Sequence, residues 1–269
     1  MDGEDLSVYL SGQRLYGDSL DAAELERWWR DEEDAYAALG AGDRERYRYG
    51  YHALNRRHGF RHLPDRRYER ALGLWSAYGD EFLPIAAQIG QLTVVESCEA
   101  FYSDRVHGVP ATYVKPEPSG VLPFDDASFD LISCLNVLHH VANVSFVVSE
   151  LARCLAPGGF ALIHEPVVSM GDWRVRRPSL TRHERGIPAP IYRRILKDAG
   201  FTVVNEAFCL FPPIPRFYDA IGRAAYNGRA ATWLDSWICG LLAWNLRYHR
   251  TRLFERFSPT CIYSVLTRS

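Results

Sequence analysis

Several features that mark particular classes of protein are scarce or missing in this chain. Its formal net charge is −2, so it lacks the basic excess of a general nucleic-acid binder, and we expect no nucleic-acid partner. Its six cysteines include no CxxC pair and no close Cys/His spacing, which favours reduced thiols over a disulfide framework or a zinc site. The opening residues MDGEDLSVYL lack the basic and apolar regions of a signal peptide, so a cytoplasmic protein is expected.

Long hydrophobic runs are missing as well. The most apolar segment, Trp233–Leu246, is shorter than the roughly 18 residues that a membrane span needs, and it contains Asp235 and Asn245. We therefore expect no membrane span, which leaves open a helix that faces lipid or a second subunit. The chain has enough apolar residues for a large hydrophobic core, because 47% of its 269 residues are hydrophobic. Its length suits one large domain or a domain with an added lobe.

Residues 125–166 predict one complete strand–helix–strand unit. Asp130–Leu135 and Phe160–His164 are short apolar runs, which are typical of buried parallel strands. Between them, apolar residues of Val144–Leu155 recur with the i, i+3, i+4, i+7 spacing of an amphipathic helix, and residues 157–159 (Pro-Gly-Gly) end it. Because such crossovers are right-handed, the two strands are expected to be parallel neighbours.

The residues of this unit resemble the class I S-adenosylmethionine-dependent methyltransferases, in their small-molecule, type 11-like branch. The resemblance rests on LPFDDASFDLI (122–132), LHHV (138–141) and LARCLAPGG (151–159), which occur in the same order and spacing. It extends from about Arg70 to Phe208. It implies a doubly wound α/β, Rossmann-like sheet of seven strands with the last strand antiparallel. It also implies S-adenosylmethionine as cofactor and S-adenosylhomocysteine as product.

The chain then divides into four predicted segments. Residues 1–69 form a helical preface, with helices from about 19 and from about 43, that lies against the sheet or covers the site as a lid. Residues 70–208 are the core, residues 209–259 a helical insertion, and residues 260–269 the final strand. Further strands are expected at 71–74, 92–96, 111–114, 201–208 and 260–267, and helices at 80–89, 187–201, 217–226 and 232–248. The insertion serves as a packing lobe, a substrate cap or a surface for a homodimer.

The loop after the first strand departs from the family pattern of acid-x-Gly-x-Gly-x-Gly. Gly73 stands at the acid, Trp75 and Ala77 stand at the first two glycines, and only Gly79 remains. A bulky residue held at positive φ costs roughly 1–2 kcal/mol, so either the loop takes another path or cofactor binding is altered. The resemblance implies that Glu96 accepts hydrogen bonds from the ribose hydroxyls. The expected cofactor-binding residues are Gly73, Trp75, Ser76, Ala77, Gly79, Glu96, Ser97, Leu122, Phe124 and Asn136.

Three further acids have two interpretations each. Asp80 and Glu81 either replace the missing acid near the cofactor amino group or simply favour a helix N-terminus, and we prefer the structural interpretation. Glu117 stands near the place of a family Asp that binds adenine, and it substitutes only if the neighbouring prolines bend the loop suitably.

The catalytic candidates follow the fourth and fifth strands, at the carboxyl edge where doubly wound folds bind ligands. His139 and His140 supply a base of suitable pKa, or only shape the wall, and Glu165 assists with the proton. The next segment is rich in arginine, which binds phosphate or carboxylate groups bidentately or forms internal salt bridges. The expected substrate-binding residues are Asp172, Trp173, Arg174, Arg176, Arg177 and Arg185. No ligand spacing demands a metal, and none is expected.

These observations predict an enzyme that methylates a hydroxyl of a small polar metabolite, such as a sugar, a nucleotide sugar or a natural product. One alternative keeps the fold but not the reaction, since Trp75 in the cofactor loop suits a cyclisation, hydrolysis or rearrangement. The other alternative is an inactive partner that stabilises an active enzyme through residues 209–259.

Overall fold

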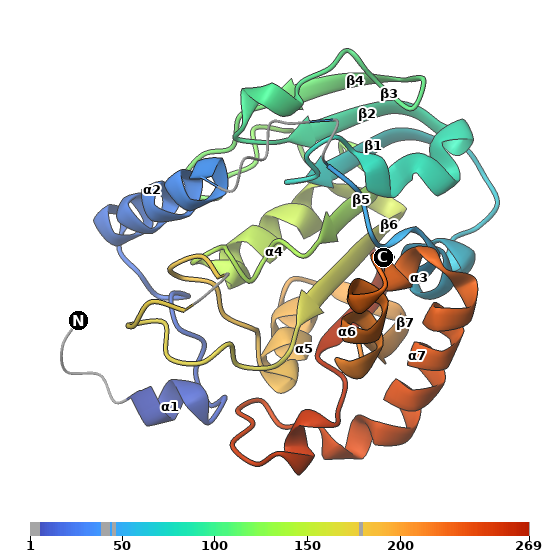
Figure 1. The fold of residues 1–269 in the computed structure, drawn as a ribbon. Coiled ribbons are helices and arrows are strands. Elements are labelled where there is room, and N and C mark those ends of the chain that lie inside the picture. Colours follow the sequence, from blue (N-terminus) through green and yellow to red (C-terminus); the bar gives the residue numbers. More distant parts are fainter. Residues whose placement is uncertain (1–5, 39–43, 45–46, 178–179, 269) are drawn as a thin grey trace.

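The computed structural model describes residues 6–38, 44, 47–177 and 180–268. They form an eight-stranded sheet with the order β3-β4-β2-β1-β5-β6-β8-β7 (Figure 1). Its strands are β1 Tyr68–Leu74, β2 Ile89–Val95, β3 Arg105–Val106, β4 Val109–Val114, β5 Phe129–Leu135, β6 Leu155–Pro166, β7 Phe201–Cys209 and β8 Cys261–Arg268. Strands β4, β2, β1, β5 and β6 pair in parallel, whereas β8 is antiparallel to both of its neighbours. The doubly wound, Rossmann-like fold and its antiparallel last strand are therefore confirmed.

Helices cover both faces of the sheet. They are α1 Leu6–Leu10, α2 Ala22–Ala38, α3 His52–His58, α4 Val144–Cys154, α5 Ala189–Asp198, α6 Pro213–Ala220 and α7 Arg229–Leu242. Shorter 3₁₀ helices include η2 Asp80–Gln88, η4 Ala225–Asn227, η5 Ala243–Asn245 and η6 Phe254–Arg256. In Figure 1, α2 and the loop after β6 lie at one end of the sheet, and α6 and α7 lie on the opposite side of the molecule.

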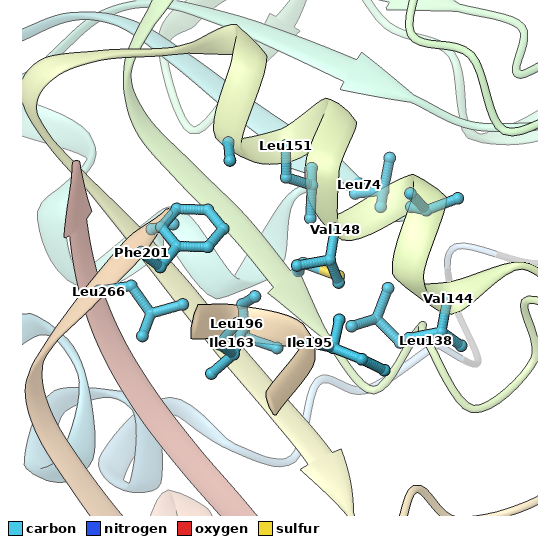
Figure 2. Packing of buried hydrophobic residues seen from close by; sticks show 14 of the residues in the cluster. Leu74, Leu138, Val144, Val148, Leu151, Ile163, Ile195, Leu196, Phe201 and Leu266 are labelled. Atoms are coloured by element: carbon cyan, nitrogen blue, oxygen red, sulfur yellow. The ribbon is translucent and has the colours of Figure 1, made fainter. Parts of the chain in front are cut away.

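The core has two layers because the buried strands are apolar on both faces. On one face, Val144, Val148 and Leu151 of α4 and Ile195 of α5 pack on sheet residues such as Ile163 (Figure 2). On the other face, a second cluster joins the sheet to η2, α3 and α7. It includes Leu54, Phe82, Leu131, Leu162, Cys239 and Val265. Helix α4 begins and ends within a residue of its predicted bounds, whereas Pro157, Gly158 and Gly159, which were expected to end it, lie within β6 at a shift of its register with β5.

The differences from the predicted elements have local causes. The eighth strand, β3, is the short arm of a hairpin, whose two turn residues His107 and Gly108 have φ of 50° and 85°, the values of a tight primed turn. The helix expected from 80 to 89 is a 3₁₀ helix with Pro84 inside it, where the missing N–H disfavours an α-helix. The second helix of the preface was expected from about 43, but residues 43, 45 and 46 lie outside the described residues, and the described residues 47–51 precede a helix that begins at His52. In the insertion, α6 ends at Ala220, just before Gly222 with φ of 67°.

No helix among the described residues combines the length and the apolar character that crossing a bilayer requires.

Candidate cofactor and substrate site

A cavity of about 840 Å³ lies at the carboxyl edge of the sheet. Its floor is the loop after β1 and the loop after β5, and its far wall is α2 together with the segment before α3. This volume is within the usual range for sites that enclose small molecules. The carboxyl edge of a doubly wound sheet, at the point where strand order reverses between β1 and β5, is where such folds bind ligands.

The loop after β1 keeps a left-handed backbone at the three alternate positions of the glycine pattern. The φ angles are 45° at Trp75, 47° at Ala77 and 67° at Gly79. The Trp75 N–H donates to the carbonyl of Val95 at 2.7 Å, and the Ala77 N–H donates to Glu96 Oε2 at 3.0 Å. Hydrogen bonds thus hold two non-glycine residues in strained conformations, at roughly 1–2 kcal/mol each. The indole of Trp75 lines the cavity.

Position 73 has no room for an acid, and of the nearby acids Glu81 lies at the cavity. A Cβ on Gly73 would lie 2.8 Å from Ser76 Cβ, so an acidic side chain has no room there. Glu81, in η2, lines the cavity and is almost fully buried. Burial raises the pKa of Glu81 to about 7, against a hydrogen bond from Ser76. Of the two neighbouring acids, Asp80 instead pairs with Arg44. The structural interpretation therefore suits Asp80, and the cavity-facing acid is Glu81.

Glu96 lies beneath the loop and does not line the cavity. Its Oε2 accepts the Ala77 N–H and its Oε1 accepts the Cys98 N–H, each at 3.0 Å. Burial raises the pKa of Glu96, although these hydrogen bonds oppose the shift. The structure places Glu96 in a supporting position under two loops, the neighbouring Ser97 lines the cavity, and hydrogen bonding of Glu96 to a ribose stays a prediction.

Leu122 and Phe124, two of the expected cofactor-binding residues, pack into the core. Leu122 is buried in the core, and Phe124 packs against the same cluster with its ring 4.9 Å from that of Phe129. Neither residue lines the cavity, whose wall on this side is formed by Glu117, Pro118 and Gly120. Both side chains pack against the apolar layer between β5 and α4, because burial of apolar surface is more favourable than its exposure to water.

Glu165 fastens the loop that carries the histidines. Its carboxylate accepts the backbone N–H groups of Val137, Leu138 and His139 at 2.8, 2.7 and 3.2 Å, and His139 Nδ1 lies 2.8 Å away. Burial would raise the pKa of Glu165, but these donors outweigh it and lower the pKa. Burial lowers the pKa of His139. Neither residue lines the cavity, so both hold the loop in position.

His140 does line the cavity, and its partner comes from α2. His140 Nδ1 lies 2.9 Å from Glu32 Oε2 and 3.2 Å from Thr181 Oγ1. Burial alone lowers the pKa of His140, but the hydrogen bond and the charge of Glu32 outweigh it and raise the pKa. His139, His140 and Glu184 also present ligand-type atoms within 4.8 Å of one another, a grouping that sequence spacing did not predict.

Replacing Glu32 by Gln is expected to lower the pKa of His140, because only the weaker effects of Glu184 and Glu165 then oppose burial. NMR titration of the imidazole C–H signals measures this shift. Asp31→Asn is the matched control, since Asp31 pairs with Arg182 and His183 instead. An unchanged pKa of His140 in Glu32→Gln, or an equal shift in the control, contradicts the pairing.

The arginine segment after β6 is only partly directed at the cavity. Arg176 and Arg177 line it, but Arg177 donates to carbonyls of its own loop, including Glu184 at 2.6 Å. Arg174 forms an exposed salt bridge with Asp172 at 2.9 Å. Trp173 is buried, stacked on Tyr16 with the ring centroids 4.4 Å apart. Among the described residues, Arg176 is therefore the predicted substrate-binding arginine that lines the cavity without a hydrogen bond or salt bridge to the protein.

Arg185 was predicted to bind substrate, but the structure places it away from the cavity. The side chain is fully buried, and burial lowers its pKa to about 10. Its guanidinium lies over the ring of Trp28, at 4.9 Å from the centroid. It donates to the backbone carbonyls of Tyr16, Leu138, His139 and Ala142. Arg185 therefore joins the preface to the histidine loop and cannot reach a substrate.

One wall of the cavity is held by the insertion. Asn227 Oδ1 accepts the His52 N–H at 3.0 Å, and Asn227 Nδ2 donates to the carbonyl of Tyr49 at 2.8 Å. The rings of Tyr51 and Tyr226 stack at 6.0 Å. Because Tyr49 and Tyr51 line the cavity, η4 of the insertion positions that wall.

Residues 77–163 match a sequence family described as a methyltransferase domain. The matched residues make up about a third of the chain, and over them the chain is similar to methyltransferase domains. A solved structure of this fold, a Haemonchus contortus N-methyltransferase with a TM-score of 0.52 at 18% identity, covering 80% of this chain and 51% of that chain, is in complex with S-adenosylhomocysteine. The match covers β2, β3, β4, β5, α4 and most of β6, so the part of the chain that is similar to a methyltransferase domain includes the histidine loop.

The chain spans less than half the length of the first curated relatives that it matches. The 24-methylenesterol C-methyltransferase 2 of Oryza sativa subsp. japonica is 30% identical over 131 residues, which cover 45% of this chain and 35% of the rice protein. A chain in the complex of the Haloferax volcanii Trm112 methyltransferase activator has a TM-score of 0.56 at 18% identity, covering 88% of this chain and 96% of that chain. The 4+2 cyclase SpnF has a TM-score of 0.51 at 16% identity, covering 77% of both chains. These solved structures show the fold alone.

Proposed function

We propose that this protein uses S-adenosylmethionine to methylate a hydroxyl of a small polar metabolite, such as a sugar, a nucleotide sugar or a natural product. The observation that carries the proposal is the wall of the 840 Å³ cavity. It combines a left-handed loop, a buried carboxylate and a His–Glu pair at the carboxyl edge of the methyltransferase domain.

The cavity wall fits the cofactor. The positive φ angles at Trp75, Ala77 and Gly79 shape the loop as the family's glycines do. The buried carboxylate of Glu81 suits the cationic amino group, because an ammonium stabilises its charged form. Ser97 offers a polar group for the ribose. When bound, S-adenosylmethionine supplies an electrophilic methyl group on its sulfonium.

The residues around the histidine loop perform the remaining chemistry. With Nδ1 donating to Glu32, His140 keeps Nε2 as an acceptor, and this nitrogen takes the proton of the substrate hydroxyl. Glu165 and His139 hold the loop, and Asn136 and Arg176 bind polar groups of the substrate from the cavity wall. Helix α2 covers the cavity as a lid, which excludes water from the reacting atoms.

The cysteines are all unpaired, which supports a cytoplasmic location.

Calorimetric titration of the purified chain with S-adenosylmethionine tests the proposal. We expect micromolar binding, and release of S-adenosylhomocysteine when the acceptor is present. ATP is the control, because it shares the adenosine but lacks the amino-acid end. No binding of S-adenosylmethionine, or equal binding of ATP, contradicts the proposal.

A second candidate is non-methylating chemistry on the same fold. The indole of Trp75 favours it, because it occupies a wall position where the family has glycine, and its ring lies 5.5 Å from that of Trp29 on α2. The fold is also that of a protein described as a cyclase. Conversion of an acceptor without formation of S-adenosylhomocysteine distinguishes this candidate from the first.

A further inference from the structure

Helix α7 has its apolar side toward solvent. Asp235 and Cys239 face the core, whereas Trp233, Trp237 and Leu241, spaced four residues apart, share the outer side. Trp233 and Trp237 are each 58% exposed. Leu234 and, in η5, Trp244 are exposed as well. These five outward residues, Trp233, Leu234, Trp237, Leu241 and Trp244, are called the tryptophan face below.

The tryptophan face continues onto the loop that contains η6. The rings of Trp244 and Phe254 lie 6.1 Å apart, and Leu253 and Phe257 are also exposed. Asn245 Nδ2 donates to the carbonyls of Phe254 and Phe257 at 3.0 Å each, which fixes this loop beside the end of α7. A contiguous exposed apolar patch of this kind marks an interaction surface.

The orientation of α7 is fixed from within. Asp235 accepts the N–H groups of Leu210 and Phe211 at 3.0 and 2.7 Å and the hydroxyl of Tyr226 at 2.9 Å. Turning the helix to bury its tryptophans would take this carboxylate away from all three donors. The outward position of the apolar side is therefore built into the fold.

The segment that contains the tryptophan face is rich in arginine. Residues 209–259 contain seven arginines against Asp219, Asp235 and Glu255, a formal charge of +4 in a chain of net −2. Six of the arginines are exposed, and among the described residues none of the six is in a salt bridge with a carboxylate. They are Arg216, Arg223, Arg229, Arg247, Arg252 and Arg256. Arg229 lies one helical turn before Trp233, and Arg252 and Arg256 flank Leu253 and Phe254.

We propose that this lobe docks on the surface of a lipid bilayer that carries anionic headgroups. Tryptophan rings are favoured at the boundary of headgroups and acyl chains, leucine and phenylalanine insert below it, and arginines pair with anionic lipids. Helix α7 would lie in the plane of this boundary. A second copy fits the surface poorly, because a two-fold interface would place arginine against arginine.

Co-sedimentation of the full chain with vesicles tests the proposal. Vesicles of phosphatidylcholine with phosphatidylglycerol are expected to bind it at least tenfold more tightly than vesicles of phosphatidylcholine alone, and added salt should weaken the binding. A Trp233→Ser, Trp237→Ser, Trp244→Ser variant should lose at least tenfold in affinity. An Arg229→Gln, Arg247→Gln, Arg252→Gln variant should lose the preference for anionic vesicles.

Matched controls lie outside the lobe. Phe146→Ser with Val175→Ser removes exposed apolar side chains, and Arg30→Gln with Arg67→Gln removes exposed charges. Both should bind as the unchanged chain does. The changed residues are on the surface, and circular dichroism checks that each variant folds. An unchanged chain that stays in the supernatant overturns the proposal, as do equal losses in the controls or a dimer in light scattering that the tryptophan variant abolishes. None of these outcomes depends on methyl transfer.

Discussion

Arg185→Ala is expected to lower the free energy of unfolding by about 3–5 kcal/mol, because it removes a buried side chain with several hydrogen bonds, each contributing roughly 1 kcal/mol. The guanidinium donates hydrogen bonds to the carbonyls of Tyr16, Leu138, His139 and Ala142. These groups remain buried without their donor, and the contact with Trp28 is lost. Urea unfolding followed by circular dichroism measures the change.

Two substitutions show whether the fork of donors is the cause. Arg176→Ala removes an exposed arginine of the same loop and should change stability by less than about 0.5 kcal/mol. Arg185→Lys keeps the charge but cannot reach separate carbonyls with a planar fork, so most of the loss should remain. Equal stabilities of the Arg185 and Arg176 alanine variants would show that the buried position is wrong.

Glu81→Gln is expected to weaken S-adenosylmethionine binding about 10- to 100-fold, the effect of losing a charged hydrogen bond of roughly 1.5–3 kcal/mol. The reason is the ammonium of the cofactor, which in the proposed function faces this carboxylate. Titration calorimetry of both proteins measures the ratio. Glu33→Gln, which changes another acid of the cavity wall, should leave the affinity nearly unchanged. Methylthioadenosine lacks the amino group and should bind both proteins alike. Equal loss with this ligand would contradict the role of Glu81.

The pH dependence of Glu81 has a definite sign. Its pKa of about 7 in the folded protein exceeds the ordinary value of 4.5. The folded state therefore holds a proton that the unfolded state has lost, and its stabilising effect is complete below pH 4.5 and disappears as the pH rises through 7. An ammonium ligand needs the deprotonated form, so affinity should rise between pH 6 and 8 in the unchanged chain and stay flat in Glu81→Gln.

The sheet could be predicted from the sequence because its determinants are local. The apolar runs of β5 and β6 and the spacing of Val144–Cys154 each indicate their element without knowledge of the rest. The loop after β1 could be located but not described. Its backbone conformation depends on bonds from Trp75 to Val95 and from Ala77 to Glu96, and sequence reasoning weighs the strain of a residue but not such distant compensation.

The candidate site was harder to predict, because its pairs join distant parts of the chain. Glu32 is 108 residues from His140, and nothing in either segment marks the pairing. Glu81 looked like an ordinary acid at the start of a helix, and only the structure shows that it is buried at the cavity wall. Arg185 belongs to a cationic segment, and burial separates it from the arginines that reach the cavity.

The contact of Asn227 with Tyr49 and His52 gives the insertion influence over the cavity. A ligand that needs the Tyr49 wall in one position stabilises one seating of the insertion, and a surface that favours that seating strengthens the ligand by the same factor. Binding of a ligand in the cavity and binding of the lobe to a lipid surface would then be thermodynamically coupled. Under both proposals, the affinity for the ligand would be highest when the tryptophan face is already bound to a bilayer.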